Sequence, residues 1–162
     1  MQHDNARWPL TLFVLVLLAS ALLGCMHGSA SVSATGRPIT VEIWASDGCP
    51  EVGQTITLRA TVANVSSQTQ TVELNNQPVL DIVVGPQNDG QRWSAGKTLT
   101  SDLTHLELKP GESKSIEMPW VIRPGTIPLP VSARFIADSQ SSYYPMTALM
   151  VVGGSCHLIG GP

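Results

Sequence analysis

The segment TITLRATV (residues 55–62) decides the fold class of this chain. Its apolar residues Ile56, Leu58, Ala60 and Val62 alternate with threonine and arginine. Alternation with a period of two is typical of a β-strand that buries one face and exposes the other. Residues 39–44 show the same alternation, so two strands precede the middle of the chain.

Further strand-like runs follow at short and regular intervals. They cover residues 71–74, 80–84, 103–108, 115–121, 130–137 and 147–152. Asp-Gly, Asn-Asn and Pro-Gly pairs, which are typical of turns, lie between them. No window has a helical period with capping residues at its ends. The pattern predicts an all-β protein with a single immunoglobulin-like antiparallel β-sandwich of about seven to nine strands.

The composition excludes one class of partner. The chain has 162 residues, which is room for one domain, and a net charge of −3. Charged residues make up 13% of it, about half of the roughly 25% found in ordinary globular domains. Its basic residues are scattered, whereas a nucleic-acid-binding surface needs concentrated positive charge. We therefore expect no nucleic-acid partner.

The N-terminal segment is typical of an export signal. A single basic side chain, Arg7, precedes an apolar run over residues 10–18, and small residues follow. The run is shorter than the roughly 20 residues that span a bilayer, which argues against a permanent transmembrane helix. An ordinary cleaved secretory signal and an uncleaved membrane anchor are the alternatives to the interpretation below.

The sequence LLGC (residues 22–25) resembles the cleavage box of bacterial lipoproteins. The resemblance implies a diacylglyceryl thioether on the Cys25 sulfur, cleavage after Gly24 and acylation of the new amino terminus. Two or three acyl chains form an anchor that does not readily dissociate, at about 0.8 kcal/mol per buried CH₂. We therefore expect a domain anchored in the cell membrane or outer membrane that faces outside the cytoplasm.

The three cysteines agree with this interpretation. An exported protein with an odd number of cysteines leaves one unpaired, and lipidation of Cys25 would leave Cys49 and Cys156 as a pair. Their disulfide would close a loop around most of the domain, worth up to about 4.7 kcal/mol in the chain-entropy model. Two separate buried thiols are the alternative. No pair of cysteines has the spacing of a zinc site.

These boundaries divide the chain into three parts. Residues 1–24 form the lipoprotein signal peptide, and residues 39–159 form the β-sandwich domain. Between them, MHGSASVSATGR (residues 26–37) is small and polar. We therefore expect residues 25–38 to form a flexible tether between the lipid and the domain.

The family resemblance lies in residues 80–120. This stretch contains Asp81 in a strand, then Arg92-Trp93-Ser94, then Leu108-Lys109-Pro110-Gly111-Glu112, and a strand that ends near Trp120. Together with TLRATVANVSSQTQTVEL (residues 57–74), it resembles the BsuPI-like intracellular proteinase inhibitor family over roughly residues 40–138. The resemblance implies a protein-binding domain whose partner is a peptidase.

The motif residues also have roles that the sequence alone suggests. Pro110 and Gly111 suit the two corners of a β-turn, and we expect Asp81 to be a solvated or hydrogen-bonded carboxylate. Trp93 and Trp120 suit the ends of a sandwich core. A position for Trp93 on a binding surface is the alternative.

The residues offer no catalytic or cofactor site. The histidines at positions 3, 27, 105 and 157 form no nucleophile–base pair and no metal-ligand pattern. We therefore expect a protein without enzymatic activity, catalytic residues, metal or cofactor. Residues 85–100, 123–130 and 138–145 are the candidate inhibitory loops. A structural or assembly module of the cell envelope, with no peptidase partner, is the competing hypothesis.

Overall fold

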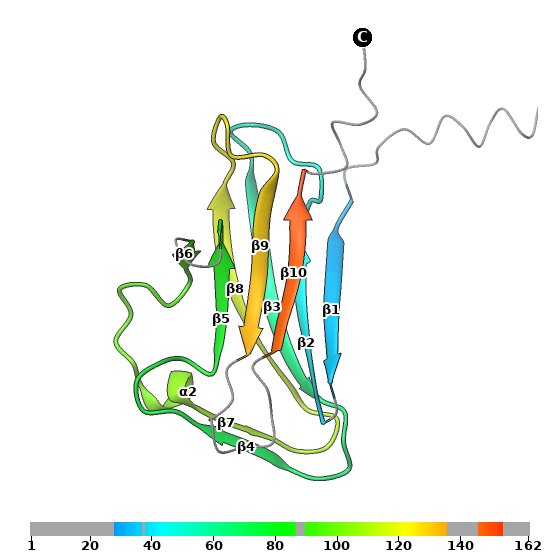
Figure 1. Ribbon diagram of the computed structural model, residues 1–162, viewed down its shortest axis with the longest axis vertical. Helices are drawn as coiled ribbons and strands as arrows, with labels where there is room; N and C mark the ends of the chain where they lie inside the picture. The colour runs from blue at the N-terminus through cyan, green and yellow to red at the C-terminus, as the bar shows by residue number, and fades with distance from the viewer. Residues whose placement is uncertain (1–27, 37, 87–89, 136–145, 154–162) are drawn as a thin grey trace, which may run out of the picture.

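The computed structural model describes residues 28–36, 38–86, 90–135 and 146–153. Two antiparallel four-stranded sheets face each other, so the predicted all-β sandwich is confirmed (Figure 1). One sheet contains, in spatial order, β1 (Ala30–Gly36), β2 (Ile39–Ala45), β3 (Thr55–Asn64) and β8 (Ser113–Val121). The other contains β10 (Met146–Val152), β9 (Leu129–Phe135), β5 (Leu80–Val84) and β6 (Gln91–Arg92).

A small third sheet lies at one end of the sandwich. It pairs β4 (Gln70–Glu73) with β7 (His105–Leu108). A four-residue helical turn, α2 (Ser101–Thr104), leads into β7, so the run predicted as a strand at residues 103–108 begins as a helical turn. Within the described residues, no helix is long and apolar enough to cross a bilayer.

The core follows from the alternation in β3. Its inward side chains, Ile56, Leu58, Ala60 and Val62, are fully buried. They pack in one apolar cluster with residues of the second sheet such as Phe135. Burial of a single leucine or valine side chain is worth about 1.5–3 kcal/mol, so this cluster is the main source of stability.

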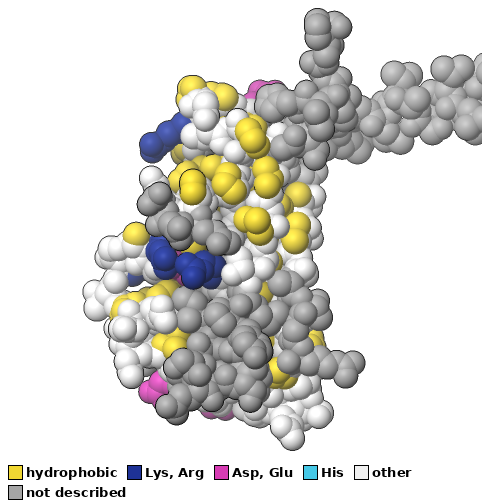
Figure 2. All heavy atoms as spheres, viewed as in Figure 1, with side chains coloured by type: hydrophobic (Ala, Val, Ile, Leu, Met, Phe, Trp, Pro, Cys, Tyr) yellow, Lys and Arg dark blue, Asp and Glu magenta, His cyan; other side chains and the backbone are white. Residues whose placement is uncertain are grey.

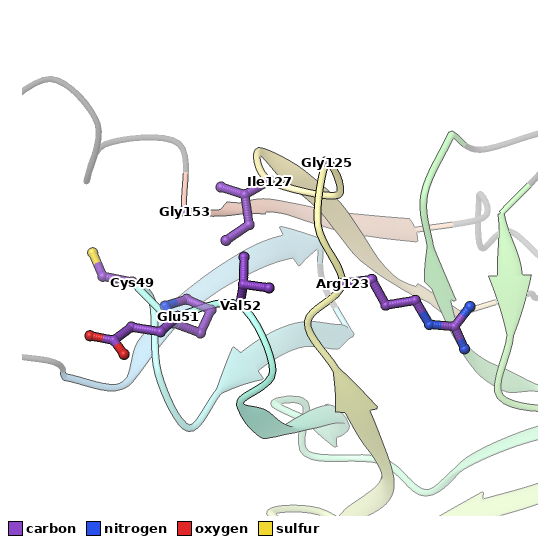
Figure 3. A pocket seen from close by; sticks show the side chains of 8 residues that line it. Cys49, Glu51, Val52, Arg123, Gly125, Ile127 and Gly153 are labelled. Atoms are coloured by element: carbon purple, nitrogen blue, oxygen red, sulfur yellow. The ribbon is translucent and has the colours of Figure 1, made fainter.

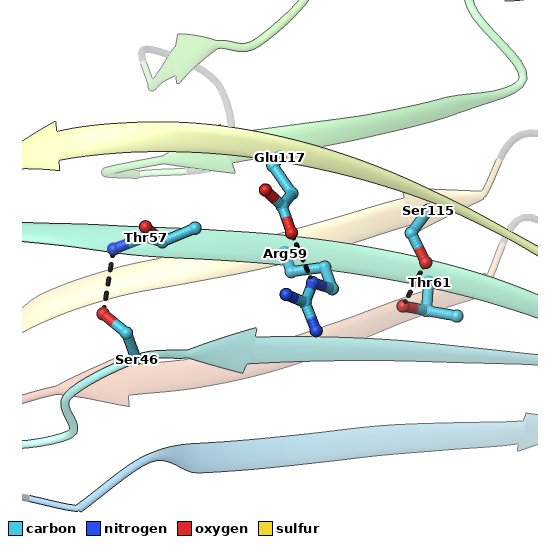
Figure 4. A network of polar contacts seen from close by, with 6 residues as sticks. All are labelled: Ser46, Thr57, Arg59, Thr61, Ser115 and Glu117. Carbon is cyan, nitrogen blue, oxygen red and sulfur yellow. Dashed lines mark hydrogen bonds and ion pairs between the residues drawn. The ribbon is translucent and has the colours of Figure 1, made fainter.

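The outer face of the first sheet carries polar cross-strand contacts (Figure 4). Arg59 Nε donates to Glu117 Oε1 at 2.7 Å, and the Arg59 guanidinium lies 4.7 Å from the centre of the Trp44 ring. Thr61 and Ser115 share a hydrogen bond of 2.9 Å. Both members of the ion pair are about half exposed, so it contributes little free energy. These contacts mainly favour one register of β3 against its neighbours.

Strand β1 corrects the prediction of a flexible tether. That prediction covered residues 25–38, but residues 30–36 pair with β2 along the full length of both strands. The interpretation of these residues as a tether is therefore wrong. Val32 is the only large apolar residue in this segment, so its composition did not indicate a strand. The strand forms because β2 supplies the partners of its backbone hydrogen bonds.

Strand β8 is an edge strand, and its sequence discourages pairing with a strand of another molecule. It pairs with β3 on one side only. Pro119 lies within it, and proline is tolerated in a sheet where its missing N–H faces away from the ladder. Pro119 and the charged Glu117 discourage another strand from adding at this edge.

Candidate functional site

The candidate site is built on a buried carboxylate in β5. Asp81 points to the outer face of its sheet, yet its exposed fraction is 0%. Asp81 Oδ1 accepts hydrogen bonds from the backbone N–H groups of Ile82 at 3.0 Å and Ser94 at 3.1 Å. Asp81 Oδ2 accepts one from the Ser94 hydroxyl at 2.8 Å. A buried carboxylate needs such partners, and two of its three donors belong to Ser94.

Two arginines lie beside this carboxylate. Arg92 Nη1 is 3.8 Å from Asp81 Oδ2, and the Arg92 side chain is 41% exposed. Arg134 of β9 is the direct cross-strand partner of Asp81, so its Cβ lies on the same face of the sheet. Figure 2 shows Lys and Arg side chains gathered on this face. Arg92 and Arg134 therefore share one face of the sheet with the Asp81 carboxylate.

Trp93 fixes the chain next to this carboxylate. Its backbone N–H donates to Ile82 O at 2.9 Å. Its half-buried ring packs against the core and lines a small cavity with residues that include Leu106 and Ile116. Lys97 Nζ lies 3.3 Å from the ring centre, in a cation–π contact. Trp93 therefore belongs to the edge of the core, and Lys97 covers its exposed face.

These contacts define the lateral loop, residues 91–100, which projects from the sandwich beside β5 (Figure 1). Its first half is held by Ser94 and Trp93. Its end is held by α2, where the N–H groups of Leu103 and Thr104 donate to Thr100 O. Lys114 Nζ, from β8, donates to the backbone oxygen of Asp102 at 2.6 Å. Every residue from 95 to 100 is exposed, so an exposed segment is fastened at both ends.

The other motif residues lie elsewhere in the fold. Pro110, Gly111 and Glu112 form the turn between β7 and β8, where Glu112 N–H donates to Lys109 O at 3.0 Å. Gly111 has a φ of 77°, a conformation that favours glycine. The buried Asn64 side chain donates to Leu108 O at 2.9 Å beside this turn. The turn is a structural element that is separate from the lateral loop.

Trp120 lies near the opposite end of β8. Its ring is half buried and packs against the core. Its Nε1 is buried without a hydrogen-bond partner among the described residues. The two tryptophans of the motif thus occupy different places, and only Trp93 belongs to the lateral loop.

The second candidate loop borders a cleft of about 470 Å³ (Figure 3). Val52 and Ile127 point toward each other across it, while Arg123 points away. Gly153 closes one side, with a φ of 76°. A Cβ at Gly153 would overlap the Ile127 side chain. The walls are mostly apolar, because Glu51 and Arg123 are the only charged residues that line the cleft within the described part of the chain.

Several predicted residues lie outside the described part of the chain. They include Cys25 and Cys156, so lipidation and the Cys49–Cys156 disulfide stay predictions. The third candidate loop, residues 138–145, also lies outside it. Among the described residues, no group of three His, Cys, Asp or Glu side chains could hold a metal ion.

The sequence did not indicate where three basic residues of the candidate site and its surroundings would lie. Lys97, Lys114 and Arg134 are isolated cations in the sequence, and each finds its place only in the folded chain. One signal was available for Arg134, because strands that pair in register place opposite charges across from each other. Use of that signal required knowledge that β5 pairs with β9.

Comparison with known proteins identifies the family. The family model described as "BsuPI: Intracellular proteinase inhibitor" matches residues 46–135, which is more than half of the chain. The chain belongs to this family. The matched residues contain the whole lateral loop and most of the cleft, and the family description indicates a non-catalytic protein whose partner is a protease. No curated protein matches the chain.

Proposed function

We propose that this BsuPI-family protein is a lipid-anchored inhibitor that binds a peptidase outside the cytoplasm. The observation that carries the proposal is the lateral loop. Within the family region, it exposes residues 95–100 while Ser94 and α2 fasten both of its ends. A peptidase cleft is built to receive an exposed segment of chain, so this loop is the part of the domain best suited to enter it.

Fastening the loop favours binding through entropy. Each long side chain that becomes immobile at an interface costs about 0.5–1.5 kcal/mol, and a segment held before binding avoids part of that cost. Leu99, which is 40% exposed, offers an apolar side chain to a pocket of the partner. Lys97 contacts the Trp93 ring, which restrains the lateral loop next to Leu99. Contact through these groups is noncovalent.

The loop at residues 123–130 is the second candidate contact. Thr126 closes its start, because Thr126 Oγ1 donates to Arg123 O at 2.6 Å and accepts from Arg123 N at 3.2 Å. Three prolines restrict the backbone that follows Arg123. This loop is therefore also ordered before binding.

The anchor and the disulfide belong to the same proposal. The lipoprotein-like LLGC sequence supports lipidation of Cys25. The Cys49–Cys156 disulfide is supported by the position of β10, since Gly153 N donates to Gly48 O at 2.8 Å beside Cys49. An oxidising location outside the cytoplasm would permit such a bond.

The test is inhibition by the purified mature protein. We expect it to slow cleavage of a protein substrate by its target, in a saturable manner, within a panel of serine, cysteine and metallo-peptidases. Leu99→Ser should weaken inhibition by at least tenfold, because a buried apolar contact would be lost. Val65→Ser is the matched control, since Val65 is also exposed (53%) but lies at the far end of β3.

Two results would contradict the proposal. One is a complete panel that the parent protein leaves unaffected. The other is equal inhibition by the parent and by a variant whose residues 95–100 are replaced with glycine and serine. In either case, the interpretation as a structural or assembly module of the envelope would take its place.

A further inference from the structure

The folded domain begins very close to the proposed lipid. Gly48 N–H donates to Gly28 O at 2.9 Å, and β1 starts at Ala30. Gly28 is three residues after Cys25. A chain extends by at most about 3.6 Å per residue, so the Cα atoms of Cys25 and Gly28 are at most about 11 Å apart. A lipid on Cys25 would therefore hold Gly28 within about 11 Å of the lipid-bearing residue, and Ala30, where β1 starts, within about 18 Å of it.

Gly28 lies at one end of the sandwich, which we call the N-terminal pole. The pole contains residues 46–54, residues 122–127 and Gly153. Backbone bonds join these segments: Gly153 N donates to Gly48 O at 2.8 Å, and Gly53 N donates to Ile122 O at 2.8 Å. Figure 1 shows these loops together at the end where β1 begins, opposite β4 and β7.

We propose that the N-terminal pole lies against the membrane surface and contacts lipid. The inference rests on the proposed lipidation of Cys25. No spacer of the length predicted from the sequence separates lipid from domain, because residues 30–36 belong to the sandwich. The short connection therefore presents this pole, rather than a side or the opposite end, to the bilayer.

The chemistry of the pole suits a bilayer interface. Val52 is 59% exposed, and Val121, at the end of β8, is also exposed. Apolar side chains of this kind enter the boundary between headgroups and acyl chains. Arg123 is exposed and directed away from the cleft (Figure 3), where it can meet anionic lipid phosphates. Glu51, which is exposed, and Asp47, which is buried, are the acidic residues of this pole, and they limit the electrostatic attraction.

This orientation separates the two candidate loops. The loop at residues 123–130 begins on the N-terminal pole and would face the membrane. The lateral loop leaves the side of the sandwich (Figure 1) and would stay open to a partner in solution. Membrane contact therefore assigns peptidase binding on the anchored protein to residues 95–100.

The test places a fluorescent side chain at either end of the lipidated protein. Val52→Trp adds an indole to the N-terminal pole, and Val65→Trp adds one to the opposite end at a residue of similar exposure. The protein is made with its own signal, its lipid label is measured, and it is placed in phosphatidylglycerol and phosphatidylethanolamine vesicles whose acyl chains carry bromine near the headgroup. The fluorescence of the parent is subtracted. We expect at least half of the added fluorescence to be quenched in V52W and almost none in V65W.

Two outcomes would overturn the inference, and they are distinguishable. Equal quenching of both variants, or none, in protein that carries the lipid label would refute the orientation and leave the anchor intact. A protein without lipid label that does not float with vesicles would refute the anchor and the orientation together. Unchanged thermal unfolding of both variants would show that each substitution leaves the fold intact.

Discussion

The Asp81 carboxylate should be the strongest single determinant of the lateral loop. Asp81→Ala removes the acceptor of three hydrogen bonds and leaves both Ser94 donors unpaired in a partly buried place. Hydrogen bonds to charged groups are worth about 1.5–3 kcal/mol each and are not additive. We therefore expect a loss of about 3–5 kcal/mol in the free energy of unfolding, from the three hydrogen bonds together. Arg92 adds little, because its closest nitrogen is 3.8 Å away and its side chain is partly exposed.

Two further variants separate the contributions of the Asp81 charge and the Ser94 hydroxyl to this free energy of unfolding. Asp81→Asn keeps the volume and one acceptor oxygen, so it should cost about 1–2 kcal/mol. Ser94→Ala removes only the bond at 2.8 Å and should cost about 1.5–3 kcal/mol. The double variant of Asp81→Ala and Ser94→Ala should lose less than the sum of the single losses, by about 1 kcal/mol or more, because the two residues share one contact.

Urea unfolding measures these losses, and the exposed Asp102 provides the control. Asp102→Ala should change the free energy of unfolding by less than about 0.5 kcal/mol, because the bond from Lys114 uses the backbone oxygen of Asp102. A loss below about 1 kcal/mol for Asp81→Ala would refute the reasoning. So would strict additivity with Ser94→Ala. A small loss would mean that water replaces the carboxylate without cost, and additivity would mean that Asp81 and Ser94 share no stabilising contact.

Three further predictions follow from the chain. Cys25→Ala should leave an unprocessed precursor without label from a palmitate analogue, and cleavage and release at the normal rate would show an ordinary secreted protein. Non-reducing peptide maps should join the peptides that contain Cys49 and Cys156, and free thiols at both positions in protein from the cell surface would contradict the pairing. Gly153→Ala should cost about 1–2 kcal/mol from its left-handed backbone and more from overlap with the facing isoleucine. Gly96→Ala is the control, because Gly96 has a similar φ and no atom lies near the position of its Cβ. An equal loss of stability at both positions would show that the overlap at Gly153 is relieved without cost.

The parts of the fold that the sequence predicted are those with strong alternation. In β3, every second residue from Ile56 to Val62 is apolar and buried, so pattern and burial agree. Strand β1 was missed because its residues are mostly serine and alanine, and its pairing depends on β2 rather than on its own apolar content. Leu103 and Thr104, the last two residues of α2, fall in a run predicted as strand, because a four-residue turn has no helical period to detect.

The candidate site was harder to predict for a different reason. The sequence identified Asp81, Arg92, Trp93 and Ser94 through a family resemblance, but it did not show that Asp81 and Ser94 are bonded. The two residues are 13 positions apart, and their contact arises because β6 pairs with β5 and brings Ser94 to the outer face of β5. Burial on both faces of β5 is a property of the tertiary structure. No local pattern in five residues could have shown it.

The pairing of β1 with β2 also affects what proteolysis near its N-terminal strands does to the domain. A cut before Gly28 would release a sandwich with all its strands. A cut between the two strands would leave β1 attached by noncovalent bonds alone, and its loss would make β2 an edge. Strand β2 carries alternating apolar residues, contains no proline and has Glu42 as its only charge. Such an edge recruits strands from other copies, so the position of a single cut decides between a soluble fragment and an aggregating one.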